Sequence, residues 1–255
     1  MTDSNIGRFV WYDLLIPVPQ DAVTFYETVI GWTGQPREPG YTMFVTPQGP
    51  VGGVMALPDQ ARRMGSGPIW TSFVQVSDVD ATIAKAISLG GSLHVPPSDV
   101  PGFGRMAVIM DPQGGHIDIV APSAPLQLHD PSKPGEFVWS ELLTTDHEAA
   151  FTFYSALFGW QKVRDFDMGA MGMYLIYSVG GRELGGMFTK PKDMPAPPGF
   201  WFYIMVSDLD ATIACATSKG AKLMNGPMSV PGGARIAQLS DPQGARFALH
   251  ENPKT

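Results

Sequence analysis

The sequence has a single cysteine among its 255 residues, and only 17 lysines and arginines against 24 aspartates and glutamates. One cysteine, Cys215, cannot form a disulfide within the chain, which fits a reducing compartment, and we therefore expect a cytoplasmic protein. The net charge of −7, without any run of basic residues, argues against binding to nucleic acid. No apolar run approaches the roughly 20 residues that span a bilayer, and residues 1–5 show neither the basic nor the apolar segment of a secretory signal, so we expect no membrane partner.

The composition also excludes a disordered chain. Apolar residues make up 44% of the sequence and charged residues 16%, which is an ordinary globular balance. Disorder requires low hydrophobicity and high net charge. A chain of 255 residues is long enough for two domains of ordinary size, each with its own core.

One stretch of the sequence occurs twice. Residues 9–15 (FVWYDLL) return as residues 137–143 (FVWSELL), and each copy is followed by a Phe-Tyr pair and then by Gly-Trp. An internal repeat of this length predicts two homologous domains. We place these domains at residues 1–122 and 136–255, with a Pro- and Ser-containing linker over residues 123–135.

Two further motifs occur once in each half. The sequence Ser-Asp-x-Asp-Ala-Thr-Ile begins at Ser77 and again at Ser207, and Asp-Pro-Gln-Gly begins at Asp111 and again at Asp241. Ser77 to Asp80 predicts a helix start that resembles a capping box, with Asp in place of Glu at the third helical position. Each half therefore contains two units of the pattern βαβββ, although the second strand of the first unit is weakly marked.

The glycine pairs Gly52-Gly53 and Gly185-Gly186 lie within predicted strands. They do not form a phosphate-binding loop, because no Lys-Ser or Lys-Thr follows and no helix begins there. Glycine inside a strand is typical of a bulge or of a close approach by another backbone. We predict one of these two roles.

The order of these motifs resembles the vicinal oxygen chelate superfamily, which includes glyoxalase I, bleomycin-resistance proteins and extradiol dioxygenases. The resemblance rests on the opening strand before Phe25-Tyr26 and Gly31-Trp32, the turn at Ser77 and the turn at Asp111, each with a counterpart in the second half. It implies an α+β fold of four βαβββ units, paired into two glyoxalase-like domains with curved, cup-forming mixed sheets. Metal-dependent members place His, Gln or Glu ligands at four inward positions of such a cup.

This sequence departs from that ligand pattern. Each position has a counterpart in each half: Trp11 and Trp139 in the opening strand, Met55 and Phe188 in the Gly-Gly strand, Thr71 and Trp201 before the Ser-Asp turn, and Asp118 and Ala248 in the last strand. Only Asp118 could bind a metal ion, whereas a stable site needs three or four protein ligands. We therefore expect no cofactor, and we keep a displaced divalent metal site as the alternative.

Acidic and imidazole side chains near these positions could form the displaced site. Asp13 shares a strand face with Trp11, and His116 shares one with Asp118, because side chains two residues apart point the same way. Glu141 and His250 lie in the corresponding strands of the second half, as does Arg246. An equally good interpretation is that Asp13 and Glu141 only accept hydrogen bonds that hold the sheet together.

Without a metal ion, the inward positions would form an aromatic cup. Aromatic side chains favour planar or hydrophobic small molecules through stacking and burial of apolar area. The residues that we predict to bind such a ligand are Trp11, Asp13, Phe73, His116, Asp118, Trp139, Glu141, Trp201, Tyr203 and His250.

Three function classes fit this sequence. They are a metal-independent small-molecule binding protein like the bleomycin-resistance branch, a glyoxalase-, lyase- or dioxygenase-type enzyme with a displaced metal site, and a scaffold whose aromatic residues only fill the cups. Family members with a single such half pair as dimers, and the fusion can supply this pairing within one chain. A monomer or a homodimer is expected.

Overall fold

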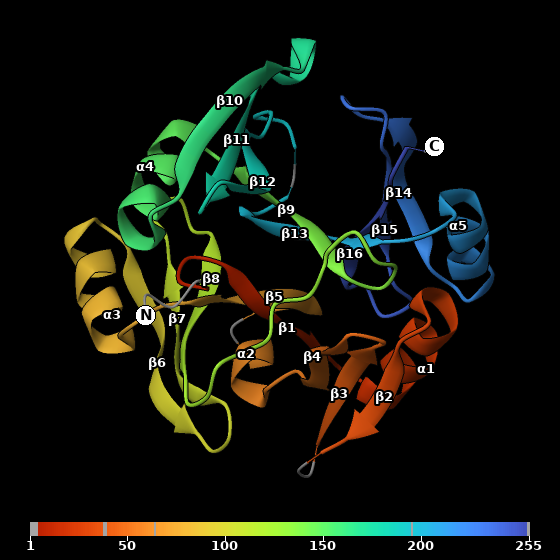
Figure 1. Ribbon diagram of the computed structural model, residues 1–255, viewed down its shortest axis with the longest axis horizontal. Coiled ribbons are helices and arrows are strands. Elements are labelled where there is room, and N and C mark those ends of the chain that lie inside the picture. Colours follow the sequence, from red (N-terminus) through yellow and green to blue (C-terminus); the bar gives the residue numbers. More distant parts are fainter. Residues whose placement is uncertain (1–4, 38–39, 64, 195, 254–255) are drawn as a thin grey trace. The chain divides into compact units, whose positions relative to one another are not determined.

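The computed structural model describes residues 5–37, 40–63, 65–194 and 196–253, and it confirms the α+β fold built from four βαβββ units (Figure 1). The first unit comprises β1 (Phe9–Ile16), α1 (Pro19–Ile30), β2 (Thr33–Pro36), β3 (Tyr41–Thr46) and β4 (Gly49–Ala56). A short helix that the sequence did not predict, α2 (Asp59–Arg63), leads into the second unit. That unit comprises β5 (Ile69–Gln75), α3 (Val79–Ser88), β6 (Ser92–Val100), β7 (Gly104–Met110) and β8 (His116–Pro122).

The second half of the chain repeats this order. The third unit comprises β9 (Phe137–Thr144), α4 (His147–Phe158), β10 (Gln161–Asp167), β11 (Met173–Val179) and β12 (Arg182–Thr189), with a short 3-10 helix, η1 (Gly169–Met171), before β11. The fourth comprises β13 (Gly199–Met205), α5 (Leu209–Ser218), β14 (Lys222–Ser229), β15 (Arg235–Ser240) and β16 (Arg246–Glu251). None of these helices is long and apolar enough to cross a membrane, among the residues that the structure describes.

Each half of the chain contributes one eight-stranded mixed sheet. The strand orders are β2-β3-β4-β1-β5-β8-β7-β6 and β10-β11-β12-β9-β13-β16-β15-β14. The opening strand pairs in parallel with the Gly-Gly strand in both sheets, so Gly53 lies opposite Asp13 and Gly186 lies opposite Glu141. The two sheets therefore have the same topology, as the repeat predicts.

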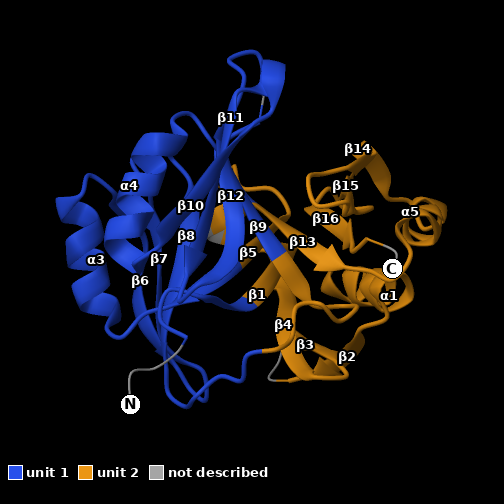
Figure 2. Cartoon of the chain, turned by 45° about the horizontal axis from the view of Figure 1, so that its top comes forward, with its two compact units in different colours: residues 1–11, 72–128, 139–200 blue, residues 12–71, 129–138, 201–255 orange. Residues whose placement is uncertain are grey.

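The four βαβββ units pack into two compact units, and this grouping differs from their order in the sequence (Figure 2). One compact unit, unit 1, contains residues 1–11, 72–128 and 139–200, and the other, unit 2, contains residues 12–71, 129–138 and 201–255. In unit 1 helix α3 packs beside α4, and in unit 2 helix α1 packs beside α5. Each compact unit thus joins one βαβββ unit from the first half of the chain to one from the second.

The repeated Phe-Tyr and Asp-Pro-Gln-Gly motifs meet in this packing. The Tyr154 hydroxyl donates a hydrogen bond of 2.8 Å to Asp111 in unit 1, and the Tyr26 hydroxyl donates one of 3.2 Å to Asp241 in unit 2. Each aspartate also accepts hydrogen bonds from two backbone N–H groups of its own turn. The motifs that identify each half therefore hold together elements from opposite halves.

The helix start at Ser77 differs from the prediction. Asp78, not Ser77, is the N-cap of α3, and its side chain accepts a hydrogen bond from the backbone N–H of Ala81. Asp80 does not close a capping box but binds the Arg105 guanidinium at 2.7 and 2.9 Å. The Arg105 guanidinium binds both carboxylate oxygens of Asp80. The Asp80 side chain therefore points towards β7 and not towards the start of α3.

The glycine pairs confirm the prediction of a close backbone approach. A Cβ atom on Gly52 would lie 1.9 Å from the backbone oxygen of Tyr12, and one on Gly185 would lie 1.8 Å from that of Ser140. Neither residue can be anything larger without moving the neighbouring strand.

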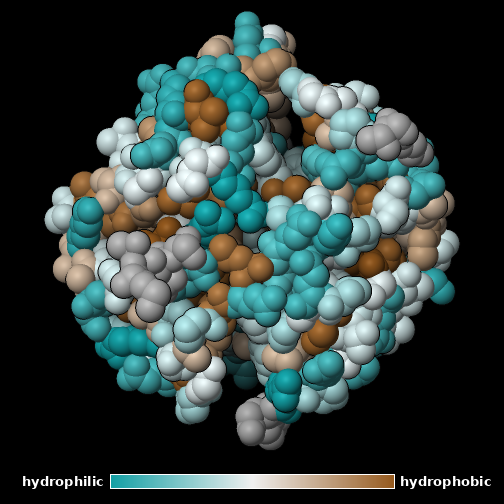
Figure 3. Space-filling view, viewed as in Figure 1, coloured by the Kyte–Doolittle hydropathy of each residue, from teal (hydrophilic) through white to brown (hydrophobic). Residues whose placement is uncertain are grey.

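On the face of the molecule in Figure 3, hydrophobic residues form separate patches among hydrophilic ones, as on an ordinary protein surface.

Candidate functional site

The ten predicted ligand-binding residues are divided between the two compact units. Unit 1 holds Trp11, Phe73, His116, Asp118, Trp139 and Glu141, and unit 2 holds Asp13, Trp201, Tyr203 and His250. Within these units they fall on four strand faces.

The first face, in unit 1, gathers aromatic rings around a residue that the sequence analysis missed. Phe103, in the loop before β7, makes edge-to-face contacts with Trp11 and Phe73 at centroid distances of 5.8 and 5.2 Å. Phe73 lies opposite Asp118 in the parallel pairing of β5 with β8, and both side chains are buried. The aromatic residue at position 103 is a glycine in the second half, Gly233, and this difference was the available signal.

The histidine on this face lies beside another histidine, with the two rings tilted relative to each other. The His116 ring lies 4.3 Å from the His94 ring, measured between centroids, and His94 is exposed. Partial desolvation by the surrounding protein, and then the neighbouring His94, lower the pKa of His116. The imidazole of His116 is therefore held in its neutral form near pH 7.

The second face, also in unit 1, contains a tyrosine that bridges two predicted residues. The Trp139 indole N–H donates to the Tyr174 hydroxyl at 2.9 Å, and that hydroxyl donates to Glu141 Oε2 at 3.1 Å. Tyr174 comes from β11 and its ring passes over Gly186, where a Cβ atom would lie 1.9 Å from the ring. The second glycine of the pair therefore makes room for this tyrosine.

The third face, in unit 2, contains the same kind of hydrogen bond between a tyrosine and an acid. The Tyr41 hydroxyl donates to Asp13 Oδ1 at 2.7 Å, and a Cβ atom on Gly53 would lie 2.1 Å from the same hydroxyl. Asp13 is buried beneath it. The Tyr-acid-Gly arrangement occurs in both halves, so the acids of the opening strands accept hydrogen bonds from tyrosines of the neighbouring strands.

The fourth face, in unit 2, is formed by β13, β16 and β15. Tyr203 lies opposite Ala248, which in turn lies opposite Gln238, and the Gln238 amide donates across the alanine to the Tyr203 hydroxyl at 2.9 Å. The small side chain of Ala248 leaves room for this hydrogen bond. The uncharged side chains of Gln238 and Tyr203 therefore cover Ala248, which is the counterpart of Asp118 in the first half.

A charged group and a histidine lie at the two ends of this fourth face. The Arg246 guanidinium lies over the Trp201 ring, 5.7 Å from its centroid. His250 is half-buried, its Nδ1 atom is buried without a hydrogen-bond partner, and desolvation lowers the pKa of its imidazole.

The residues present do not fit a divalent metal ion. Within the described part of the chain, no three His, Cys, Asp or Glu side chains lie close enough together to hold one. The positions at which the family resemblance implies ligands hold mostly tryptophan, threonine and apolar residues. Asp118 alone supplies too few donors.

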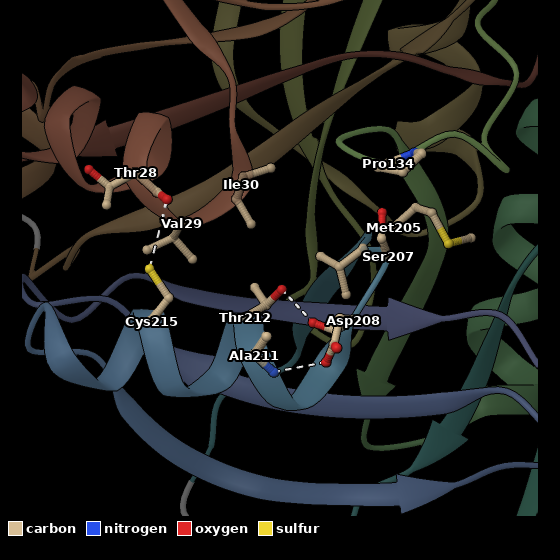
Figure 4. Close-up of a pocket in the computed structure, with 11 residues that line it drawn as sticks. Thr28, Val29, Ile30, Pro134, Met205, Ser207, Asp208, Ala211, Thr212 and Cys215 are labelled. Carbon is tan, nitrogen blue, oxygen red and sulfur yellow. Dashed lines mark hydrogen bonds between the residues drawn. The ribbon is translucent and has the colours of Figure 1, made fainter. Parts of the chain in front are cut away.

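A cavity of about 300 Å³ lies elsewhere in unit 2, between the end of α1 and the start of α5 (Figure 4). Three of its polar side chains, those of Asp208, Thr212 and Cys215, already interact with groups of the two helices. Asp208 is the N-cap of α5 and accepts from the Ala211 N–H at 2.9 Å, and the Cys215 thiol points to the Thr28 carbonyl at 3.8 Å. No group in this cavity is arranged for catalysis among the residues that Figure 4 labels.

Comparison with known proteins identifies the same repeat. Residues 8–119 and 136–249 each match the family model described as Glyoxalase/Bleomycin resistance protein/Dioxygenase superfamily. The "Putative glyoxylase CFP32" of Mycobacterium tuberculosis is 32% identical over 245 residues, which cover 94% of this chain and 92% of that protein. The "Anthracycline biosynthesis protein DnrV" of Streptomyces peucetius is 30% identical over 266 residues, which cover 98% of this chain and 95% of that protein.

A solved structure has the same fold at low sequence identity. The Mn(II)-bound glyoxalase from Novosphingobium aromaticivorans superimposes with a TM-score of 0.67 at 15% identity, over 98% of this chain and 84% of that one.

Proposed function

Because the chain belongs to the glyoxalase/bleomycin resistance protein/dioxygenase superfamily, we propose that it binds a small planar or hydrophobic molecule against the aromatic faces of its sheets. Binding would not use the divalent metal ion that the superfamily usually holds.

One observation carries the proposal: aromatic residues stand where the family resemblance implies metal ligands. Trp11, Trp139 and Trp201 occupy three of those positions, and each is partly exposed rather than fully buried in a core. A partly exposed indole offers a flat apolar surface for stacking, worth on the order of 1 kcal/mol beyond the area that it buries. Such surfaces are typical of sites for planar ligands.

The relatives suggest a first class of probe. One of them is named for anthracycline biosynthesis, and anthracyclines contain a fused planar ring system. Anthraquinone-2-carboxamide has such a ring system without a charge, and it quenches tryptophan fluorescence on contact.

Trp201→Ala tests the proposal. We expect the substitution to weaken binding of anthraquinone-2-carboxamide about tenfold, because a lost aromatic contact of about 1.4 kcal/mol corresponds to that factor. Isothermal titration calorimetry measures the affinity, and Ile87→Ala, at an exposed apolar side chain of α3, is the control. An unchanged affinity of the Trp201→Ala protein would count against the proposal.

The two alternatives give different results in the same protein preparation. Stoichiometric Ni, Zn, Fe or Mn in elemental analysis of the purified protein would favour a metal-dependent glyoxalase-, lyase- or dioxygenase-type enzyme. Absence of both metal and probe binding would favour a scaffold, in which the aromatic side chains serve only packing.

A further inference from the structure

The fourth face, in unit 2, carries a positive charge that has no acidic partner. Among the described residues, no carboxylate lies within 4.0 Å of the Arg246 guanidinium. Other arginines of the sheets are paired: Arg105 binds Asp80 at 2.7 Å, and Arg235 binds Asp210 at 2.9 Å. An arginine left without an acid on a strand face is available to an anion from outside the chain.

The aromatic neighbour of Arg246 orients this charge. The guanidinium lies over the Trp201 ring, 5.7 Å from its centroid, and Arg246 is exposed whereas Trp201 is half-buried. This cation–π contact keeps the guanidinium beside the indole, and a guanidinium can bind a carboxylate with two parallel hydrogen bonds. The indole beside it offers apolar surface to the ring that bears the carboxylate.

The centre of the face is neutral, unlike its counterpart in the first half. Ala248 stands where the first half has Asp118, and the hydrogen bond from Gln238 to Tyr203 covers it. An anion bound at Arg246 therefore meets no carboxylate on this face. The corresponding position of the first half holds the buried carboxyl group of Asp118.

His250 supplies a second polar group at the far end of the face. It lies opposite Met205 on one side and Ile236 on the other, which explains why its buried Nδ1 atom has no partner. It lies four positions after Arg246 on β16, or about 13 Å away at the usual rise per residue. A neutral imidazole can donate or accept one hydrogen bond with a hydroxyl or carbonyl group of a ligand.

We infer that the face formed by β13, β16 and β15 selects a planar aromatic anion. Arg246 binds the carboxylate or phenolate oxygen, Trp201 stacks with the ring, and His250 bonds to a polar group at the opposite end. This inference rests on the proposed function, because it names the class of molecule that the aromatic site would take.

Two probes of the same shape test the charge preference. Anthraquinone-2-carboxylate and anthraquinone-2-carboxamide differ in charge but share their rings and quinone carbonyls. We expect the full-length protein to bind the carboxylate at least tenfold more tightly in calorimetry at fixed ionic strength. Arg246→Gln should weaken carboxylate binding about 10- to 100-fold, as charge-assisted hydrogen bonds are lost, and change carboxamide binding less than about twofold.

Three further variants complete the experiment. Lys219→Gln removes the same charge at the C-cap of α5, outside the three strands of the face, and should leave both affinities unchanged. Arg246→Lys keeps the charge but loses the planar fork, and should give an intermediate carboxylate affinity. His250→Phe should weaken both probes about fivefold, because each contains the quinone carbonyls.

The outcomes separate this inference from the proposed function. Equal binding of the two probes, or an unchanged carboxylate affinity in a folded Arg246→Gln protein, would overturn the inference and leave aromatic binding intact. Unchanged affinities in His250→Phe would overturn the role of that residue. Failure of the unmodified protein to bind either probe would refute the proposed function itself. Thermal melting of each variant establishes that it is folded.

Discussion

In both halves of the chain, a tyrosine hydroxyl donates a hydrogen bond to the carboxylate of the opening strand. Tyr41 bonds to Asp13 and Tyr174 bonds to Glu141, and in each case a glycine of the adjacent strand leaves room for the ring. Tyr174 also accepts the indole N–H of Trp139. The tyrosine thereby fixes the orientation of the tryptophan that we expect to contact a ligand.

Gly186→Ala tests this arrangement of single residues. The new methyl group would overlap the Tyr174 ring, with a contact of 1.9 Å, so we expect a loss of about 1–3 kcal/mol in the free energy of unfolding. The displaced ring should also release Trp139 and change its fluorescence emission. Urea denaturation measures the first effect and emission spectra the second.

Gly199→Ala is the matched control for that substitution. Gly199 begins β13, and a Cβ atom there would meet nothing within 4 Å. Its free energy of unfolding should stay within about 0.5 kcal/mol of the unmodified protein. If both alanine variants lost the same stability, the cause would be the loss of glycine itself and not the contact with Tyr174.

At the scale of helices and strands, the hydrogen bond from Tyr154 to Asp111 joins α4 to the turn before β8. The carboxylate is buried and accepts from the tyrosine at 2.8 Å as well as from backbone N–H groups. Burial raises the pKa of Asp111, and the hydrogen bonds that it accepts oppose that change. Removal of the hydroxyl would leave a buried carboxylate oxygen with one donor fewer.

We therefore expect Tyr154→Phe to lower the free energy of unfolding by about 1–3 kcal/mol. A double-mutant cycle with Asp111→Asn isolates the interaction between the two side chains. Chemical denaturation of the four proteins should give a coupling energy clearly above experimental error. Strictly additive losses would show that this hydrogen bond does not hold α4 to the turn.

The sequence predicted the helices and strands better than it predicted which residues contact one another. The strand and helix patterns of the four units were clear, but β2 was weakly marked because Thr33, Gln35 and Pro36 are exposed and show no apolar alternation. His129 lies in the linker, yet its side chain is only 11% exposed, because it bonds to the buried Glu136 at 2.9 Å. Glu136 directly precedes β9 and lies seven positions after His129, so no short-range sequence pattern predicts this contact.

The candidate site shows the same limit. A period of two placed Trp11 and Asp13, and likewise Trp139 and Glu141, on one face of each opening strand. Tyr174 was missed because it reaches the face from a neighbouring strand, and Phe103 because it reaches its face from a loop. Similar patterns in all four units could not indicate which of them pack together.

For the whole molecule, the buried tyrosines set the response to alkaline pH. Burial, and then the nearby aspartate, raise the pKa of both Tyr26 and Tyr154 well above the ordinary value of 10.0. A raised folded-state pKa means that the stability from the neutral phenol is fully present below about pH 10. It is lost as pH rises towards the folded value, because only the unfolded chain releases the proton.

The free energy of unfolding should therefore fall above pH 10 by up to about 1.4 kcal/mol per pH unit for each of these tyrosines. A Tyr26→Phe and Tyr154→Phe double variant is less stable at neutral pH, but its unfolding free energy should decline less steeply between pH 9 and 11. Urea denaturation across that range gives both slopes. Parallel slopes would mean that other groups, such as lysines or the remaining tyrosines, control the alkaline limit, and that the two buried hydroxyls ionise as readily in the folded as in the unfolded chain.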